Sequence, residues 1–215
     1  MMKIICGNAL TELNKLPDES VNCIITDPPW NVGKDYGIFK ENWTEQEYLE
    51  WIQSFIFEFK RVSNNKIVLI LGSEIILKWW QFLPDAKLII VHKGTISRGK
   101  IKNFFLQYKG ILTTVPSNEK IYDIWTDIKW PGDGYFYNEP RYGHPAMTPL
   151  KLAERLVRIF SKENDIIFEP FCGVGTIPLA CLKHKRKFIA TELNQTYINK
   201  ANERIQAYIT QLRFE

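Results

Sequence analysis

The chain has 215 residues, of which 45% are hydrophobic and 24% are charged. This length suffices for one domain with a substantial core, and the composition is typical of globular proteins, which excludes disorder, collagen-like sequence and an extended coiled coil. No apolar run is long enough to span a membrane, and the first residues do not form a signal peptide, so we expect a soluble intracellular protein.

The positive charge of the chain is concentrated in one window. The formal net charge is only +4, yet no Asp or Glu occurs from Ala86 to Asn118. Such a window is either a solvated basic loop or a surface that faces a polyanion, and the window alone does not separate the two. Its basic residues are Lys87, Lys93, Arg98, Lys100, Lys102 and Lys109.

The cysteines and histidines form no metal-binding pattern. Cys-x-x-Cys spacing is absent, and His92, His144 and His184 are scattered along the chain. We therefore expect no metal site, no disulfide framework, and reduced thiols that are mostly buried. The cysteines are Cys6, Cys23, Cys172 and Cys181.

Short β-branched apolar runs alternate with longer segments of helical period. This alternation predicts an α/β fold of three layers, with a doubly wound, mostly parallel sheet of seven strands. The expected strands are Lys3–Cys6, Asn22–Thr26, Lys66–Leu71, Lys87–Val91, Tyr122–Trp125, Asp165–Glu169 and Lys187–Thr191.

Capping residues mark three of the expected helices. Thr44 and Glu47 form a capping box ahead of an apolar stripe, which predicts a helix whose aromatic side chains belong to the core. A second helix is expected to begin at Thr148 and Pro149 with the Thr148 hydroxyl as its N-cap, and a third to follow Asn194.

Two segments do not show the alternation of short apolar runs with segments of helical period. We expect one domain over residues 1–215, with loop-rich insertions at about 92–120 and 130–143 that lie over the sheet. The first contains most of the basic window, and the second contains Pro131, Gly132, Asp133 and Gly134.

One expected strand ends in Asp27, Pro28, Pro29 and Trp30. In an open parallel sheet, ligands bind beyond the carboxyl ends of the strands. Two prolines supply no amide hydrogens and form a stiff turn, so the acid and the carbonyls suit a group that donates two hydrogens, such as an exocyclic amine. Trp30 can stack on the ring that carries this amine. Alternatively, Asp27 caps a turn and Trp30 belongs to the core.

A second strand leads into a glycine turn and a helix. Gly173 and Gly175 let a ligand approach the backbone, and a helix N-terminus favours negative charge. Pro178 stands where a dinucleotide fingerprint needs a glycine, which argues against NAD. The next strand ends at Glu192, about twenty residues on, where an acid can accept hydrogen bonds from ribose hydroxyls or simply begin a helix.

Taken together, these residues resemble the amino-group DNA methyltransferases that use S-adenosylmethionine, in the circularly permuted (β-type) order with the catalytic motif first. The resemblance covers nearly the whole chain and implies a Rossmann-like methyltransferase fold. It rests on the order and spacing of segments 7–10, 16–21, 25–30, 143–150, 168–176 and 189–204.

The resemblance also implies a role for each matched position. Asp27, Pro28, Pro29 and Trp30 would form the catalytic motif that holds the target amine. The family more often has Asp, Tyr, Lys and Asp at the positions of Asn8, Trp30, Thr148 and Glu169. The cofactor would contact Asn8, Ala9, Asp27, Thr148, Glu169, Phe171, Gly173, Gly175, Thr176, Glu192 and Leu193.

The implied reaction is direct methyl transfer to the N6 amine of an adenine flipped out of duplex DNA. Asp27 and the Pro28 carbonyl would accept the two amine hydrogens, without a covalent enzyme intermediate and without a required cysteine. With this chemistry in place, the basic window is interpreted as a phosphate-facing surface. Its contacts would come from Lys93, Arg98, Lys100, Lys102 and Lys109.

Several alternatives stay open at this point. The acceptor could be N4 of cytosine, although cytosine enzymes more often begin the motif with Ser, so Asp27 favours adenine. It could also be RNA or a protein amide, or the chain could be a nucleic-acid-binding module that has lost catalysis. The resemblance further implies duplex DNA as partner and the cytoplasm of a prokaryotic or virus-infected cell, and it is compatible with a homodimer and with a cognate restriction endonuclease.

Overall fold

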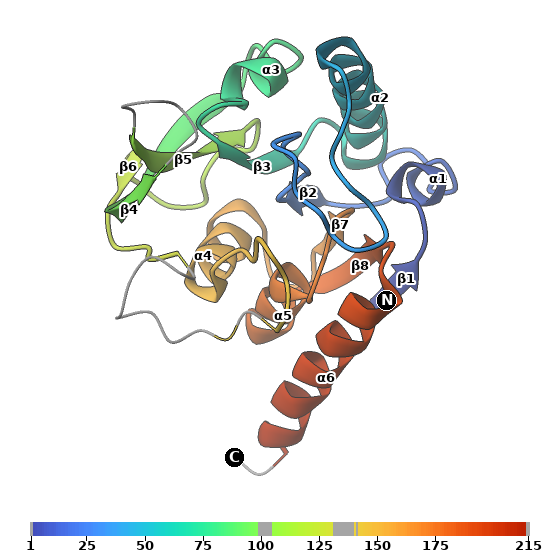
Figure 1. Cartoon of the computed structure of the whole chain (residues 1–215). Helices are drawn as coiled ribbons and strands as arrows, with labels where there is room; N and C mark the ends of the chain where they lie inside the picture. The colour runs from blue at the N-terminus through green and yellow to red at the C-terminus, as the bar shows by residue number, and fades with distance from the viewer. Residues whose placement is uncertain (1, 99–104, 131–139, 141, 214–215) are drawn as a thin grey trace.

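The computed structural model describes residues 2–98, 105–130, 140 and 142–213, which form eight strands in one sheet and six helices (Figure 1). The strands are β1 (Met2–Cys6), β2 (Cys23–Thr26), β3 (Ile67–Gly72), β4 (Lys87–Arg98), β5 (Phe105–Thr113), β6 (Ile124–Trp125), β7 (Ile166–Glu169) and β8 (Lys187–Glu192). The helices are α1 (Ala9–Leu13), α2 (Glu45–Ser63), α3 (Ile76–Trp80), α4 (Leu150–Phe160), α5 (Thr176–Lys183) and α6 (Gln195–Gln211).

The sheet has the strand order β1-β8-β7-β2-β3-β5-β4-β6. All neighbouring strands are parallel except for β5, which is antiparallel to both β3 and β4. β2 and β7 are neighbours, and the helices that follow them, α2 and α5, cover opposite faces. A crevice therefore opens at the carboxyl ends of β2 and β7, where an open α/β sheet binds its ligands.

The three layers follow from the alternation of side chains along each strand. On β2, Ile24 packs in the core that α1, α2 and α3 cover, whereas Ile25 packs in the core beneath α4, α5 and α6. Both side chains are fully buried. Because successive side chains of a strand point to opposite faces, a strand that is apolar throughout must be covered on both sides. The expected α/β fold of three layers is confirmed.

The expected sheet differs from the structure in one strand. Residues 92–120 were expected to form a loop-rich insertion, but β4 continues to Arg98 and β5 fills the space between β3 and β4. The apolar run of β5 is interrupted by Lys109 and Gly110, and this interruption weakens the period-2 signal. At Gly110 a Cβ would lie 2.5 Å from Cδ1 of Ile76, so a larger residue would force the Ile76 side chain to shift. The sheet therefore has eight strands instead of seven.

The helix starts agree with the sequence at two positions out of three. Thr44 caps α2 in a complete capping box with Glu47, and the side chain of Asn194 caps α6. Thr148, however, is not the N-cap of α4. Pro149 occupies that position, and the Thr148 hydroxyl is used elsewhere.

Candidate functional site

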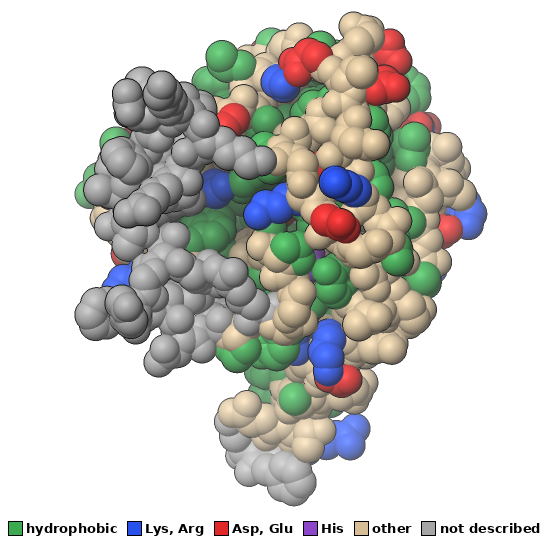
Figure 2. Space-filling view, in the orientation of Figure 1, with side chains coloured by type: hydrophobic (Ala, Val, Ile, Leu, Met, Phe, Trp, Pro, Cys, Tyr) green, Lys and Arg blue, Asp and Glu red, His purple; other side chains and the backbone are tan. Residues whose placement is uncertain are grey.

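A cavity of about 510 Å³ lies at the carboxyl ends of β2, β7 and β8. In Figure 2 it is the hollow near the centre of the molecule, with hydrophobic side chains in its interior. Its volume is within the range of small-molecule and cofactor sites. The predicted site residues that line it are Asn8, Ala9, Asp27, Pro28, Pro29, Trp30, Lys109, Thr148, Glu169, Phe171, Gly173, Thr176, Glu192 and Leu193.

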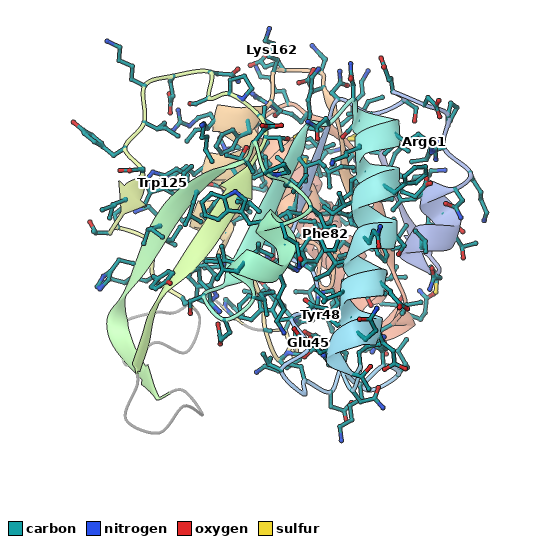
Figure 3. All side chains as sticks on the ribbon, turned by 90° about the horizontal axis from the view of Figure 1, so that it is seen from above. Glu45, Tyr48, Arg61, Phe82, Trp125 and Lys162 are labelled. Carbon is teal, nitrogen blue, oxygen red and sulfur yellow. The ribbon has the colours of Figure 1, made fainter. Side chains whose placement is uncertain are left out.

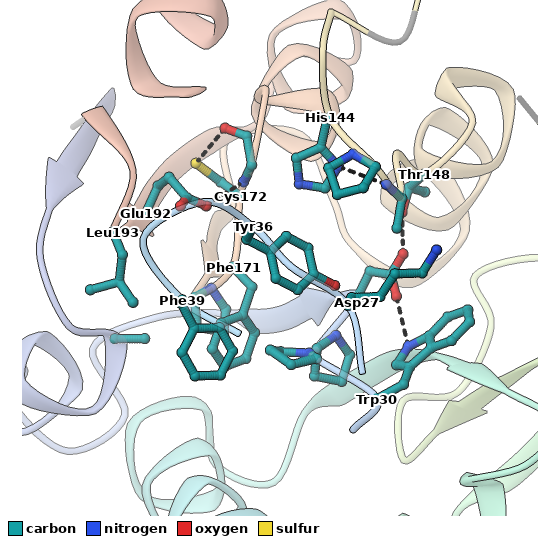
Figure 4. Close-up of a pocket in the computed structure, with 18 of the residues that line it drawn as sticks. Asp27, Trp30, Tyr36, Phe39, His144, Thr148, Phe171, Cys172, Glu192 and Leu193 are labelled. Carbon is teal, nitrogen blue, oxygen red and sulfur yellow. Dashed lines mark hydrogen bonds between the residues drawn. The ribbon is translucent and has the colours of Figure 1, made fainter. Parts of the chain in front are cut away.

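Asp27 follows β2 directly, and both oxygens of its carboxylate are held. The indole Nε1–H of Trp30 donates to Oδ1 at 3.1 Å, and the hydroxyl of Thr148 donates to Oδ2 at 2.6 Å (Figure 4). Burial raises the pKa of Asp27 to about 6, while the bond from Thr148, the charge of Lys109 and the bond from Trp30 act in the opposite direction. Asp27 is therefore a fixed acceptor that is mostly ionised at neutral pH.

Trp30 is positioned by a loop that folds back on itself. Glu41, which is 2% exposed, accepts hydrogen bonds from the backbone N–H groups of Trp30, Val32 and Lys34 at 2.9, 2.8 and 3.0 Å. A buried carboxylate needs such partners, and in return it fixes three amides of an irregular segment. Glu41 was not predicted from the sequence, because no motif marks a side chain that bonds to loop backbone.

The second proline of the motif is anchored by α2. The hydroxyl of Tyr48 donates to the carbonyl of Pro29 at 2.7 Å and accepts from Nε1 of Trp79 at 3.3 Å. The Pro29 carbonyl is thus already used, whereas Pro28 lines the cavity. The aromatic stripe of α2, expected to be core, also contributes Phe55 to the cavity wall.

The glycine turn after β7 is closed by Glu192. Gly173 has a φ of +49°, and its N–H donates to Oε2 of Glu192 at 2.9 Å. The backbone N–H of Asn194 donates to the other oxygen, Oε1, at 2.8 Å. Each oxygen keeps a further lone pair for a ligand, because a carboxylate accepts up to about four hydrogen bonds. Glu192 and Phe171 border the same part of the cavity (Figure 4).

Gly175 does not fit its expected role as a cofactor contact. It lies outside the cavity lining and forms the N-cap of α5 with a φ of +78°. A Cβ at this position would lie 2.7 Å from Cβ of Ala201 in α6. Gly175 is therefore needed for the close packing of α5 against α6.

Glu169, at the end of β7, is the most unusual acid of the site. It is 1% exposed, and its Oε1 accepts from the Thr26 hydroxyl at 2.5 Å and from the Phe171 N–H at 3.0 Å. Among the described residues, Oε2 has no hydrogen-bond partner. Burial is the main cause that raises the pKa of Glu169 to about 8. This buried oxygen at the cavity is suited to a ligand that donates a hydrogen bond or carries positive charge.

Asn8 and His144 both line the cavity, and His144 lies against Gly173. The Asn8 side chain caps α1 by accepting from the N–H groups of Leu10 and Thr11 at 3.0 and 3.1 Å. Nδ1 of His144 accepts from the Ala146 N–H at 3.2 Å, and burial lowers its pKa to about 4, so the ring is neutral at physiological pH.

Lys109 was expected on a phosphate-facing surface, and for this residue the expectation was wrong. It is 7% exposed and lines the cavity, with Nζ 3.3 Å from the centroid of the Trp30 ring. The cause is the missed strand, since β5 places Lys109 opposite Gly72 at the end of β3. Lys93 and Arg98 belong to β4, but their side chains, and Lys100 and Lys102 entirely, lie outside the described residues. Their contact with phosphate stays a prediction.

The described residues contain neither a candidate metal site nor a candidate membrane-spanning helix. Within residues 2–98, 105–130, 140 and 142–213, no group of three or more His, Cys, Asp or Glu side chains is arranged to hold a metal ion. No helix in the same residues is long and apolar enough to cross a membrane.

An open α/β sheet with an acidic Pro-Pro turn on one central strand and a glycine turn on its neighbour defines a Rossmann-like methyltransferase domain. The family model for DNA methylases of the N6/N4 type matches residues 21–110 and 80–203. The chain therefore belongs to this DNA methylase family.

Relatives of the chain support this assignment over nearly its full length. It is 28% identical to the type II methyltransferase M.HpaI of Haemophilus parainfluenzae, over 95% of this chain and 74% of the relative. It is 27% identical to the DNA adenine methyltransferase YhdJ of Escherichia coli, over 94% of this chain and 82% of that protein. The crystal structure of TTHA0409, a DNA modification methylase from Thermus thermophilus in complex with S-adenosyl-L-methionine, has the same fold, with a TM-score of 0.67, 21% identity, and coverage of 96% and 94% of the two chains.

Proposed function

We propose that this protein transfers a methyl group from S-adenosylmethionine to the N6 amine of an adenine flipped out of duplex DNA. The observation that carries the proposal is the position of Asp27, whose fixed carboxylate shares one cavity with Glu192 and the glycine turn. A site for a target amine thus adjoins a site suited to a nucleoside cofactor.

The charges and shape of the cavity fit S-adenosylmethionine. The cofactor would carry a sulfonium and an ammonium group, and the cavity presents the carboxylate of Asp27 together with the carboxyl groups of Glu169 and Glu192, which a bound cation would favour in their ionised forms. The free oxygen of Glu169 can accept from the ammonium, and Glu192 can accept from the ribose hydroxyls. The side chains of Phe39, Phe171 and Leu193 offer an apolar surface to the adenine of the cofactor. The bound cofactor would supply the electrophilic methyl group.

The protein contributes orientation and fixed acceptors. The lone pair of an aromatic amine is delocalised into its ring, so the amine is a weak nucleophile. Asp27 and the Pro28 carbonyl accept the two amine hydrogens, which turns the lone pair of the nitrogen out of the ring plane. Because Thr148 and Trp30 already hold the Asp27 carboxylate, little reorganisation is needed during the reaction. Asp27 accepts a hydrogen bond from the amine nitrogen as that nitrogen becomes positively charged and then takes its proton, so the ionised form of Asp27 is the active one. The other product would be S-adenosylhomocysteine.

Adenine is preferred to cytosine on two grounds. The motif begins with Asp27 instead of Ser, and the relative YhdJ is an adenine methyltransferase. The alternative is N4 of cytosine, because the family model covers both types. Duplex DNA would approach through the 92–120 and 130–143 segments, and dimerisation and pairing with a restriction endonuclease stay predictions from the resemblance.

Incubation of the protein with duplex DNA and isotope-labelled cofactor, followed by digestion to nucleosides and mass spectrometry, tests the proposal. N6-methyladenine is expected, and Asp27→Asn should abolish its formation while cofactor binding persists. N4-methylcytosine as the product would overturn the adenine assignment. If no nucleoside is labelled and calorimetry detects no cofactor binding, the protein is a binding module without this activity. Sequencing of the methylated DNA defines the target site.

A further inference from the structure

Lys109 is a buried cation on the target side of the cavity, and neither the motifs nor the proposed chemistry uses it. It comes from β5, next to the end of β3, whereas the glycine turn and Glu192 follow β7 and β8. A lysine is rarely buried to 7% exposure without electrostatic compensation. Here the face of Trp30 at 3.3 Å and the ring of Trp130 at 5.9 Å supply part of this compensation.

The ammonium lies where the target base would be read. The Trp30 ring that Nζ of Lys109 covers at 3.3 Å also donates through Nε1 to Oδ1 of Asp27 at 3.1 Å, so one side chain contacts both groups. The acceptor for the amine and a strong donor thus stand side by side at the same end of the cavity. Nζ also covers a face of Trp30, so a base that stacks on this face must displace the ammonium towards the edge of the base.

The target bases present a matching pair of groups. On adenine the N6 amine adjoins the acceptor N1, and on cytosine the N4 amine adjoins the acceptor N3. On guanine the N2 amine adjoins two ring nitrogens, the donor N1–H and the acceptor N3 on the sugar side of the base, so this pair of groups rejects only the N1 side of guanine. A carboxylate accepts from the amine, and an ammonium beside it donates to an unprotonated ring nitrogen, so the two pairs are complementary. Where the ring nitrogen carries a hydrogen, the ammonium faces a second donor and the pairing is unfavourable.

We propose that Lys109 is a base-reading residue, whose ammonium donates a hydrogen bond to the ring nitrogen adjacent to the amine that Asp27 holds. This proposal rests on the proposed function. It assigns Lys109 to the selection and alignment of the target base and removes it from the phosphate-facing surface.

A cycle between a protein variant and a substrate analogue tests the role. Duplexes carry the target site with either adenine or 1-deazaadenine, in which a C–H group replaces N1 and the amine is kept. Each is methylated by the wild-type protein, by Lys109→Met and by Lys109→Arg, and kcat/KM is compared. Lys162→Met is the matched control, because Lys162 is exposed and lies at the opposite end of the molecule from Tyr48, as Figure 3 shows.

The wild-type protein is expected to lose about tenfold or more in kcat/KM on the analogue, the value of a hydrogen bond to a charged group. On adenine, the kcat/KM of Lys109→Met should be lower than that of the wild-type protein by a similar factor. Replacing adenine by the analogue should then lower the kcat/KM of Lys109→Met only slightly further. Lys109→Arg should retain part of the discrimination, and Lys162→Met should behave as wild type. The analogue also differs from adenine in intrinsic reactivity. This difference is the same for every protein, so it cancels when the loss in kcat/KM on the analogue is compared between the wild-type protein and a variant.

Equal losses for the wild-type protein and Lys109→Met on the analogue would overturn the proposal and leave Lys109 with a structural role beneath Trp30. Melting temperatures show whether each variant is folded. If Lys109→Met does not fold, the loss in kcat/KM on the analogue is compared between the wild-type protein and Lys109→Arg. If the methylated base is cytosine, 3-deazacytosine is the matching analogue. If the wild-type protein methylates neither base, the proposed function fails, and the base-reading role fails with it.

Discussion

The hydroxyl of Thr148 donates a 2.6 Å hydrogen bond to Oδ2 of Asp27, although the two residues are 121 positions apart in the sequence. The bond joins the segment before α4 to the end of β2, and thereby fixes the carboxylate from the side opposite to Trp30. It stabilises the ionised form of Asp27 and lowers its pKa against the effect of burial.

Replacement of Thr148 by Val should therefore shift the pH dependence of the reaction. The pKa of Asp27 is raised to about 6 by burial, so kcat/KM should fall as the pH decreases through about 6. Thr148→Val removes a bond that favours the carboxylate, so the acidic limb should move to higher pH, and the loss should be larger at pH 6 than at pH 8. Thr148→Ser keeps the hydroxyl and should retain the wild-type profile. A loss independent of pH would contradict this role.

Glu169 should make the protein less stable as the pH rises. Burial raises its pKa from 4.5 to about 8, so between these pH values the folded chain binds the proton more tightly than the unfolded chain does. The contribution is fully present below pH 4.5 and is lost as the pH rises through about 8. Glu169→Gln has no such loss, so its melting temperature relative to wild type should increase from pH 5 to pH 9. A constant difference across this range would show that Glu169 does not titrate there.

Trp30 should matter more for the target base than for the cofactor. Stacking of a base on an aromatic side chain contributes about 1–3 kcal/mol, so Trp30→Ala should weaken binding of a duplex with a mismatched target base by roughly tenfold to hundredfold. Calorimetry should show a much smaller change in cofactor affinity. Trp30→Phe keeps a stacking ring and loses only the bond to Asp27, so it should bind the duplex better than Trp30→Ala. If Trp30→Ala lowered the affinities for the duplex and for the cofactor by the same factor, the stacking role would be wrong.

Glu41 should be required for order in the loop that carries Trp30. Its carboxylate accepts from three backbone amides, so Glu41→Ala should lower the free energy of unfolding by about 2 kcal/mol or more. Hydrogen exchange at Trp30, Val32 and Lys34 should become much faster. Glu50→Ala, at an exposed position of α2, is the control. Unchanged exchange at these three amides would mean that the loop is held by other contacts.

Cys172 lines the cavity but should have no chemical role. Burial, with the charges of Glu192 and Glu169, raises the pKa of its thiol well above its usual value, so it stays protonated and is a poor nucleophile. Cys172→Ala should retain most of the wild-type kcat. Loss of methyl transfer in a folded Cys172→Ala variant would count against direct transfer without a covalent intermediate.

Most of the sheet was predictable because its strands are buried on both faces. β2, β3, β7 and β8 appear in the sequence as short β-branched runs, and the capping residues Thr44 and Asn194 fix two helix starts. β5 was missed because Lys109 and Gly110 interrupt its pattern. Those two residues are used for the cavity and for contact with Ile76, so function and close packing override the usual composition of a strand.

The site was predictable where one motif supplies neighbouring residues. Asp27 and Trp30 are three positions apart, and their contact is local. Thr148, Lys109 and Glu41 act on this motif from other elements, and a single sequence contains no record of such distant pairs. Thr148 shows the difficulty most clearly, because Thr before Pro matches a helix N-cap, whereas tertiary structure uses the hydroxyl for the carboxylate of Asp27.

The pairing of β1 with β8 has a consequence for how the chain folds. Met2 lies beside Phe188 and Cys6 beside Glu192, so this edge of the sheet forms only after a very long loop has closed. Contacts between such distant segments slow folding, because the entropy of loop closure is lost before the contacts stabilise the chain. Glu192 is the last residue of β8, and the capping residue Asn8 follows β1. The cofactor side of the cavity should therefore assemble late in folding, after the local β4–β5 hairpin.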